Sequence, residues 1–314
     1  MTHLCTPATE PVVLALDTAN EVIALGVGRL DARTREVRVV ASVEVAAHRA
    51  SNTLLLPTID QTLTELGISR EEIACVCVGR GPGSFTGVRI AMATAKGIAS
   101  ALGVALIGVS TLDAIAWNAW AAGVRGSVAV VADAMRKEVY PVRYLLRDSV
   151  EAGADASAGA PEPGVVERLE ADRVLKAEVA AAELSGDEGA DLLGDTPVAD
   201  IDGTRLCVVG DGLTKYAELF ASCGTLGDEA LWTPKGSGLL LALQAQWRAG
   251  VADPFDALRH NPAFALPVYT RLSDAEENER IRLAKNDPRN LTTGVNDLDE
   301  AGLRRDQRAT MHDS

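Results

Sequence analysis

A glycine-rich turn between a strand-like and a helix-like segment constrains the fold of this chain more than any other feature. The turn reads Gly-Arg-Gly-Pro-Gly-Ser-Phe-Thr-Gly over residues 79–87, after the apolar run 73–78 and before residues 90–99, which carry small side chains at helical spacing. Glycines at such a turn let backbone amides approach an oxyanion or another stretch of backbone without interference from a Cβ. The turn lacks the Gly-Lys-Ser/Thr ending of a P-loop and the Gly-x-Gly-x-x-Gly of a dinucleotide site. On these residues alone it is an ambiguous phosphate loop.

The first half of the chain predicts a mixed sheet flanked by helices. Strands are predicted at 12–18, 22–28 and 36–45, followed by a helix from Ser51 to about Leu66 that Gly67 ends. A strand at 73–78, a helix from about 86 to 102, a strand at 104–109 and a helix to about 122 follow. Short connections make the first strands antiparallel neighbours. This order matches the half-module of the actin/sugar-kinase/chaperone-ATPase (ribonuclease H-like) α/β fold.

The second half predicts a second lobe with an acidic insertion. Strands are predicted at 128–132, 138–146 and 206–210, and helices at about 213–222 and 237–248. An acidic segment at about 148–204 interrupts this lobe, with one helix predicted at 165–184. The predicted organisation is therefore a first lobe at 11–122, a second lobe at 123–271 and a mostly disordered tail at 272–314.

Charge and composition exclude several classes of protein. The chain has 314 residues and a net charge of −14, but residues 147–204 alone carry 15 acidic and 4 basic side chains. The two lobes outside this segment are nearly neutral, so the chain has no basic field of the kind that a stand-alone nucleic-acid binder needs. Five cysteines without a Cys-x-x-Cys pattern, no signal peptide and no apolar stretch that could cross a membrane predict a cytoplasmic protein without membrane contact.

The turn and the helix after it also resemble a known family signature. Gly-Pro-Gly-Ser-Phe-Thr-Gly-Val-Arg-Ile at 81–90, with Ala-Lys-Gly-Ile-Ala at 95–99, is similar to the signature of the bacterial TsaB (YeaZ-type) family. The resemblance covers about 12–146, includes Asp-Ala-Met-Arg-Lys-Glu-Val-Tyr at 133–140 and returns at 267–271. The chain departs from the family in two ways: Met135-Arg136 shifts the usual Ala-Arg order, and the acidic insertion is longer than typical.

The resemblance implies a non-catalytic scaffold of the complex that makes threonylcarbamoyladenosine next to the tRNA anticodon. Its implied partners are the TsaD transferase, which it would bind and activate, and the TsaE ATPase. Transfer RNA would be met only through the complex, and a homodimer is implied when the chain is alone. Two alternatives remain open: an autonomous ATP-binding phosphotransferase of the same fold, and a homodimeric structural protein.

Catalytic sites of the related enzymes are not predicted. TsaD carries Gly-Val-Asn-His-x-x-Gly-His, but the matching stretch at 108–115 places Thr111 and Ile115 at the two histidine positions. Neither side chain replaces an imidazole ligand, so we expect no bound metal and no cofactor. The stretch 81–85 is not the Gly-x-Ser-x-Gly elbow of serine hydrolases, so Ser84 is expected to cap the following helix, and protease activity is not expected.

Nucleotide contacts have only weak candidates. Asp17 and Thr18 end the first predicted strand, where proteins of this superfamily usually place phosphate and metal contacts. Gly210 and Gly212 flank an aspartate in a possible adenosine motif. Both pairs also fit ordinary turns, so the two interpretations stay open.

Two helices carry more apolar surface than one stripe requires. Ala91, Ala95 and Ala99 form a small-residue ridge at i, i+4 and i+8, which permits close helix packing. These helices could be covered by the chain's own sheet, but the family resemblance implies that they face a partner. The predicted interface consists of Leu55, Ile59, Leu63, Val88, Ala91, Met92, Ala95 and Ala99. The signature turn beside it consists of Gly81, Pro82, Gly83, Ser84, Phe85, Thr86 and Gly87.

Overall fold

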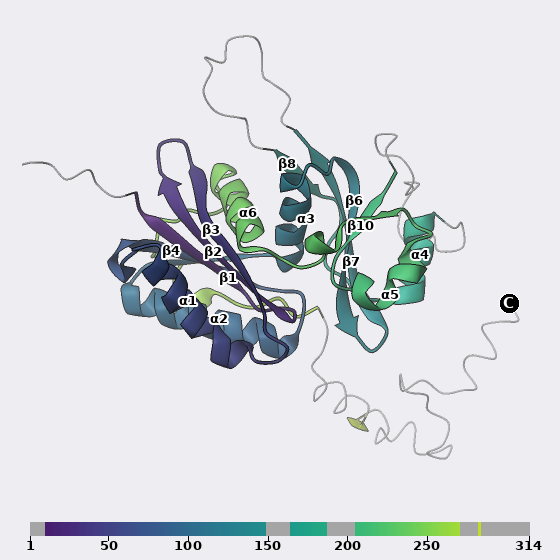
Figure 1. Ribbon diagram of the computed structural model, residues 1–314, viewed down its shortest axis with the longest axis horizontal. Coiled ribbons are helices and arrows are strands. Elements are labelled where there is room, and N and C mark those ends of the chain that lie inside the picture. The colour runs from purple at the N-terminus through teal and green to yellow at the C-terminus, as the bar shows by residue number, and fades with distance from the viewer. Residues whose placement is uncertain (1–9, 149–163, 187–204, 271–281, 284–314) are drawn as a thin grey trace, which may run out of the picture. The chain divides into compact units, whose positions relative to one another are not determined.

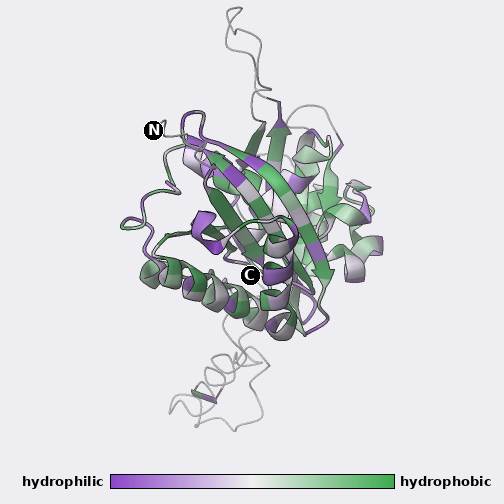
Figure 2. Ribbon diagram, turned by 60° about the vertical axis from the view of Figure 1, so that its left-hand side comes forward, coloured by the Kyte–Doolittle hydropathy of each residue, from purple (hydrophilic) through white to green (hydrophobic). Residues whose placement is uncertain are grey.

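The computed structural model describes residues 10–148, 164–186, 205–270 and 282–283, and the described residues up to 268 form one compact unit that contains every element below (Figure 1). The unit is built on two sheets, each with helices on both faces. The apolar residues that form the sheets appear in green in Figure 2. This arrangement confirms the predicted α/β fold with two mixed sheets.

The first sheet has the strand order β3-β2-β1-β4-β5. β1, β2 and β3 are antiparallel neighbours, whereas β1, β4 and β5 run parallel, as the short and long connections predict. The helices α1 and α2 cover one face. The bounds are β1 (Val12–Asp17), β2 (Val22–Asp31), β3 (Glu36–Ala46), α1 (Ser51–Glu65), β4 (Ile73–Gly79), α2 (Phe85–Leu102) and β5 (Ala105–Val109).

The second sheet has the strand order β11-β10-β6-β7-β8, and β9 pairs with β7 beside β8. On β6, Val128 and Val130 face α3, while Ala129 and Val131 face α4 and α5. The bounds are α3 (Thr111–Ala121), β6 (Gly126–Met135), β7 (Glu138–Arg147), β8 (Val165–Arg168), β9 (Leu175–Lys176), α4 (Ala177–Ser185), β10 (Cys207–Val209), α5 (Leu213–Phe220) and β11 (Thr225–Leu226). Short 3₁₀ turns lie at Arg70–Glu72, Glu229–Leu231 and Pro262–Phe264.

The helix α6 (Gly236–Arg248) corrects the predicted boundary between the lobes. Although it follows the second sheet in sequence, α6 packs on the face of the first sheet opposite α1 and α2, beside α3 (Figure 1). Glycines allow this contact: a Cβ on Gly236 would lie 2.1 Å from the Leu25 carbonyl oxygen, and one on Gly238 would lie 2.2 Å from that of Ala114. The predicted second lobe, 123–271, therefore includes a helix that completes the first lobe.

The predicted helix at 165–184 is wrong. Val165–Arg168 forms the strand β8, which pairs antiparallel with Tyr144–Arg147 of β7, and the helix α4 begins only at Ala177. The strand predicted at 128–132 is longer than expected, because β6 runs from Gly126 to Met135. The remaining parts of the predicted insertion and most of the predicted tail lie outside the described residues. Among the helices that are described, none is long and apolar enough to cross a membrane.

Candidate functional site

The signature turn packs against the turn between β1 and β2. A Cβ on Gly83 would lie 2.5 Å from the Ala19 carbonyl oxygen, and one on Gly87 would lie 1.9 Å from that of Thr18. Ser84 N donates a hydrogen bond to Ala19 O at 2.6 Å, and Thr18 Oγ1 donates one to Gly87 O at 2.6 Å. The close approach that these glycines permit is therefore used by the chain's own backbone, the second of the two uses that the sequence left open.

Ser84 is the N-cap of α2, as predicted. Its hydroxyl oxygen accepts a hydrogen bond from Gly87 N at 3.2 Å, and its carbonyl oxygen accepts one from Val88 N at 2.9 Å. The capped amide would otherwise lack a partner within the helix.

Replacing Ser84 with alanine is expected to lower the free energy of unfolding by about 1 kcal/mol, because the Gly87 amide loses its acceptor. Urea unfolding measures this loss. The control is Ser100→Ala, an exposed position near the end of the same helix, which should change stability by less than about 0.5 kcal/mol. Equal effects at both positions would contradict the capping role.

Asp17 lies at the centre of a buried polar cluster. Its Oδ2 accepts a hydrogen bond from Thr111 Oγ1 at 2.6 Å, and its Oδ1 accepts one from Ala19 N at 2.5 Å. Gly81 N in turn donates to Thr111 Oγ1 at 3.1 Å. Burial raises the pKa of Asp17 to about 6, against the opposing effect of these hydrogen bonds. The cluster joins the end of β1, the first turn of α3 and the signature turn.

Asp17 and Thr18, the weak nucleotide candidates at the end of β1, are completely buried. Their side chains are hydrogen-bonded to the chain itself, at Thr111, Ala19 and Gly87. Gly210 and Gly212 also serve a backbone contact, since a Cβ on either would lie within 3 Å of Val131 O, at 2.3 and 2.8 Å. Asp211 between them accepts a hydrogen bond from Asp133 N at 2.9 Å, which ties this turn to the end of β6.

The two positions that hold histidines in TsaD are buried here. Thr111 binds Asp17, and Ile115 packs among apolar side chains between α3 and the second sheet. No group of three His, Cys, Asp or Glu residues that could hold a metal ion occurs in the part of the chain that the structure describes.

The predicted partner face is also corrected. The first sheet buries most of the predicted set, with exposed fractions of 6% or less. These buried residues are Leu55, Ile59, Val88, Ala91, Met92, Ala95 and Ala99, and Leu63 packs partly buried against them. Sequence periodicity identified an apolar stripe correctly, but the chain's own sheet occupies it.

The outer faces of the two helices carry a different set of residues. Leu56 of α1 is 57% exposed, and Leu54 and Phe85 are also exposed. On α2 a second row of small residues, Ala93, Gly97 and Ala101, faces outward, and no atom lies within 4 Å of a Cβ placed on Gly97. The sequence contains both small-residue rows at the same spacing. The bulky Val88 and Met92 beside the first row were the available signal that it faces the core.

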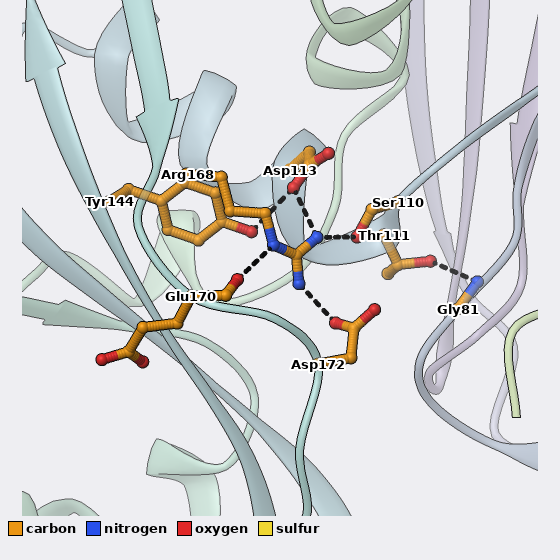
Figure 3. Close-up of polar contacts among 8 residues, drawn as sticks. All are labelled: Gly81, Ser110, Thr111, Asp113, Tyr144, Arg168, Glu170 and Asp172. Atoms are coloured by element: carbon orange, nitrogen blue, oxygen red, sulfur yellow. Dashed lines mark hydrogen bonds and ion pairs between the residues drawn. The ribbon is translucent and has the colours of Figure 1, made fainter. Parts of the chain in front are cut away.

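A second polar cluster surrounds Arg168, where β8 ends (Figure 3). Arg168 Nη1 donates to Asp113 Oδ1 at 3.0 Å and to Ser110 Oγ at 3.4 Å, and Nη2 donates to Asp172 Oδ1 at 2.5 Å. The buried Tyr144 hydroxyl donates to the same Asp113 oxygen at 2.8 Å. Burial raises the pKa of Asp113, and the Arg168 charge opposes this shift. Sequence analysis missed Arg168 because it placed the residue in a helix.

Part of this chain is similar to known sequences. The model of the family TsaD, tRNA N6-adenosine threonylcarbamoyltransferase, matches residues 43–166. The TsaB protein of Escherichia coli, a tRNA threonylcarbamoyladenosine biosynthesis protein, is 35% identical over 167 residues, which are 53% of this chain and 63% of that protein. An uncharacterized protein of Mycobacterium leprae is 38% identical over 161 residues, 49% of this chain and 41% of that protein. The chain therefore spans less than two thirds of the length of these two relatives.

Comparison with solved structures supports the same fold. A Pseudomonas aeruginosa protein described as similar to the peptidase YeaZ superimposes with a TM-score of 0.60 at 25% identity, over 83% of this chain and all of that one. YeaZ from the same organism gives 0.59 at 24% identity, over 82% of this chain and 99% of that one. Fold and comparisons together define a two-lobed, actin-like α/β protein. The chain is similar to proteins of the TsaB (YeaZ) type.

Proposed function

We propose that this chain acts in tRNA threonylcarbamoyladenosine biosynthesis as a non-catalytic subunit that binds and activates a TsaD-type transferase. The relatives from E. coli and Bacillus subtilis that bear the TsaB name support the pathway. The observation that carries the proposal is the outer face of α1 and α2, which combines exposed apolar side chains with a row of small residues.

This outer face suits a helical partner. Leu54 and Leu56, on either side of the buried Leu55, leave apolar surface of α1 exposed, and exposed apolar surface is typical of interaction sites. Ala93 and Gly97 keep the surface of α2 low, so a second helix can approach to an axial distance of about 8–10 Å. The proposed partner is the corresponding helix pair of a TsaD-type protein, and a second copy of this chain would compete for the same face.

We propose a non-catalytic role because this chain lacks histidines at the two positions where TsaD has them. Thr111 and Ile115 occupy them, and both are buried in contacts with the chain itself. The contribution to the reaction is then a difference in binding energy: the chain stabilises the TsaD conformation that accepts threonylcarbamoyl-AMP and tRNA. A TsaE-type ATPase would join the same assembly, and the transferase would supply the phosphate contacts with tRNA.

Substituting Ala93 with arginine is expected to weaken TsaD binding about a hundredfold, roughly 2.7 kcal/mol, because a long charged side chain would stand where two helices meet. Ala93 is exposed, so the variant should fold normally. Calorimetric titration with the cognate TsaD measures the affinity, and reconstituted tRNA threonylcarbamoylation with TsaD and TsaE measures the activity, which should fall in parallel.

The matched control is Ala32→Arg, which makes the same charge change at an exposed position in the turn between β2 and β3. It should bind TsaD as the unmodified chain does. Normal TsaD binding by the Ala93 variant would show that this face is not the docking surface. Full transferase activity in the absence of the chain would refute the activating role.

A further inference from the structure

The first turn of α3 is held from two sides by side chains of different lobes. On one side, Thr111 N donates to Gly81 O at 3.0 Å, while Thr111 Oγ1 accepts from Gly81 N and donates to Asp17. On the other side, Arg168 binds Ser110 and Asp113. Figure 3 shows the contacts of Arg168 and the hydrogen bond from Gly81 N to Thr111 Oγ1 on the same turn.

Arg168 contacts the N-cap residue of α3 in addition to forming ion pairs. Ser110 is the N-cap residue of α3, but its side chain caps no backbone amide and instead accepts from Arg168. The Arg168 side chain is only 25% exposed, and its Nε also donates to Glu170 O at 2.8 Å. Because Arg168 contacts both the cap residue and the third residue after it, it fixes the direction in which the helix begins.

The loop that carries Arg168 is itself anchored on the second sheet. Glu170 forms an ion pair with Arg143 of β7, and Arg173 pairs with Glu183 of α4 at 2.6 Å. A continuous series of polar contacts therefore runs from α4 through the loop 168–173 and the first turn of α3 to Gly81 in the signature turn.

We propose that Arg168 is a positioning residue that transmits the placement of the loop 168–173 to the signature turn through Thr111. The loop, which the sequence placed inside an insertion, thereby sets how the start of α2 is held. Loss of Arg168 would leave the mostly buried Asp113 without its counter-charge and release the first turn of α3. This inference does not depend on the identity of any partner.

Native-state amide hydrogen exchange on the full chain alone tests the proposal. Arg168→Gln should raise exchange at least tenfold both in the peptide covering 110–116 and in the peptide covering 79–88, although residue 168 does not touch the latter. The control is Arg147→Gln, which removes the ion pair between Arg147 of β7 and Glu167 of β8. This variant should leave exchange in both peptides unchanged.

The route through Thr111 is tested in the Thr111→Val background. There, adding Arg168→Gln should produce a smaller further rise in the 79–88 peptide, because only the backbone hydrogen bond from Thr111 N to Gly81 O still connects the two turns. Faster exchange at 110–116 with unchanged exchange at 79–88 in Arg168→Gln would overturn the proposal, as would an undiminished effect in the valine background. If Arg168→Gln does not fold, Arg168→Lys serves the same comparison: it keeps the charge but not the planar fork, and both peptides should exchange severalfold faster.

Discussion

Replacing Gly87 with alanine is expected to destabilise the protein by about 3 kcal/mol, although alanine favours helices. The new Cβ would lie 1.9 Å from the carbonyl oxygen of Thr18. This atom belongs to the backbone of a turn that is already tied to α2 by the Thr18 hydroxyl, so it cannot rotate away. Relief of the clash would require the turn between β1 and β2 to separate from the signature turn.

The control is the same glycine-to-alanine substitution at Gly97, on the exposed face of α2. Gly97 has no atom within 4 Å of a placed Cβ, so Gly97→Ala should stabilise the protein by about 0.5–1 kcal/mol. Urea unfolding of the two variants should therefore shift the midpoint in opposite directions. Stabilisation of both would mean that the contact between Gly87 and Thr18 is not close in solution.

Asp17→Asn is expected to remove a large part of the pH dependence of stability. Burial raises the pKa of Asp17 from 3.8 to about 6 in the folded state. Folding therefore favours the protonated carboxyl, whose stabilising effect is complete below pH 3.8 and is lost as the pH rises through 6. The loss for the unmodified chain amounts to about 2 kcal/mol between pH 4 and pH 7.

The asparagine variant lacks this ionisation, and its amide oxygen can still accept from Ala19 N. The difference in unfolding free energy, variant minus unmodified chain, should rise by about 2 kcal/mol from pH 4 to pH 7 and then stay level. Taking the difference cancels the contributions of other carboxyl groups. A difference that does not change with pH would show that Asp17 is not ionised against a burial cost.

Local signals in the sequence predicted the first lobe well. Strand alternation, the glycine that ends α1 and the hydroxyl of Ser84 depend on neighbouring residues, and the structure has each of these elements within a few residues of its predicted bounds. The acidic, alanine-rich composition around Val165 gave the wrong element, because pairing with Tyr144–Arg147 selects a strand there.

Contacts between distant segments could not be predicted from the sequence. Periodicity identified the rows of small residues on α2, but the sheet decides that Ala95 faces inward and Ala93 outward. Likewise, the acid at the end of β1 suggested a ligand contact, yet Thr111, 94 positions later, accounts for its buried hydrogen bond. Neither fact follows from the spacing of neighbouring residues.

The position of α6 has a consequence for how the chain folds during synthesis. Much of one face of the first sheet is covered by a helix that begins at Gly236, more than a hundred residues after β5 is complete. The first lobe therefore emerges from the ribosome with an apolar face of its sheet uncovered, and it must wait for the second lobe to be made. Such long-range contacts slow folding and leave partly made chains prone to aggregation. The two lobes are thus separate in architecture but depend on each other in folding. A chain cut between them would leave an apolar face of the first sheet uncovered.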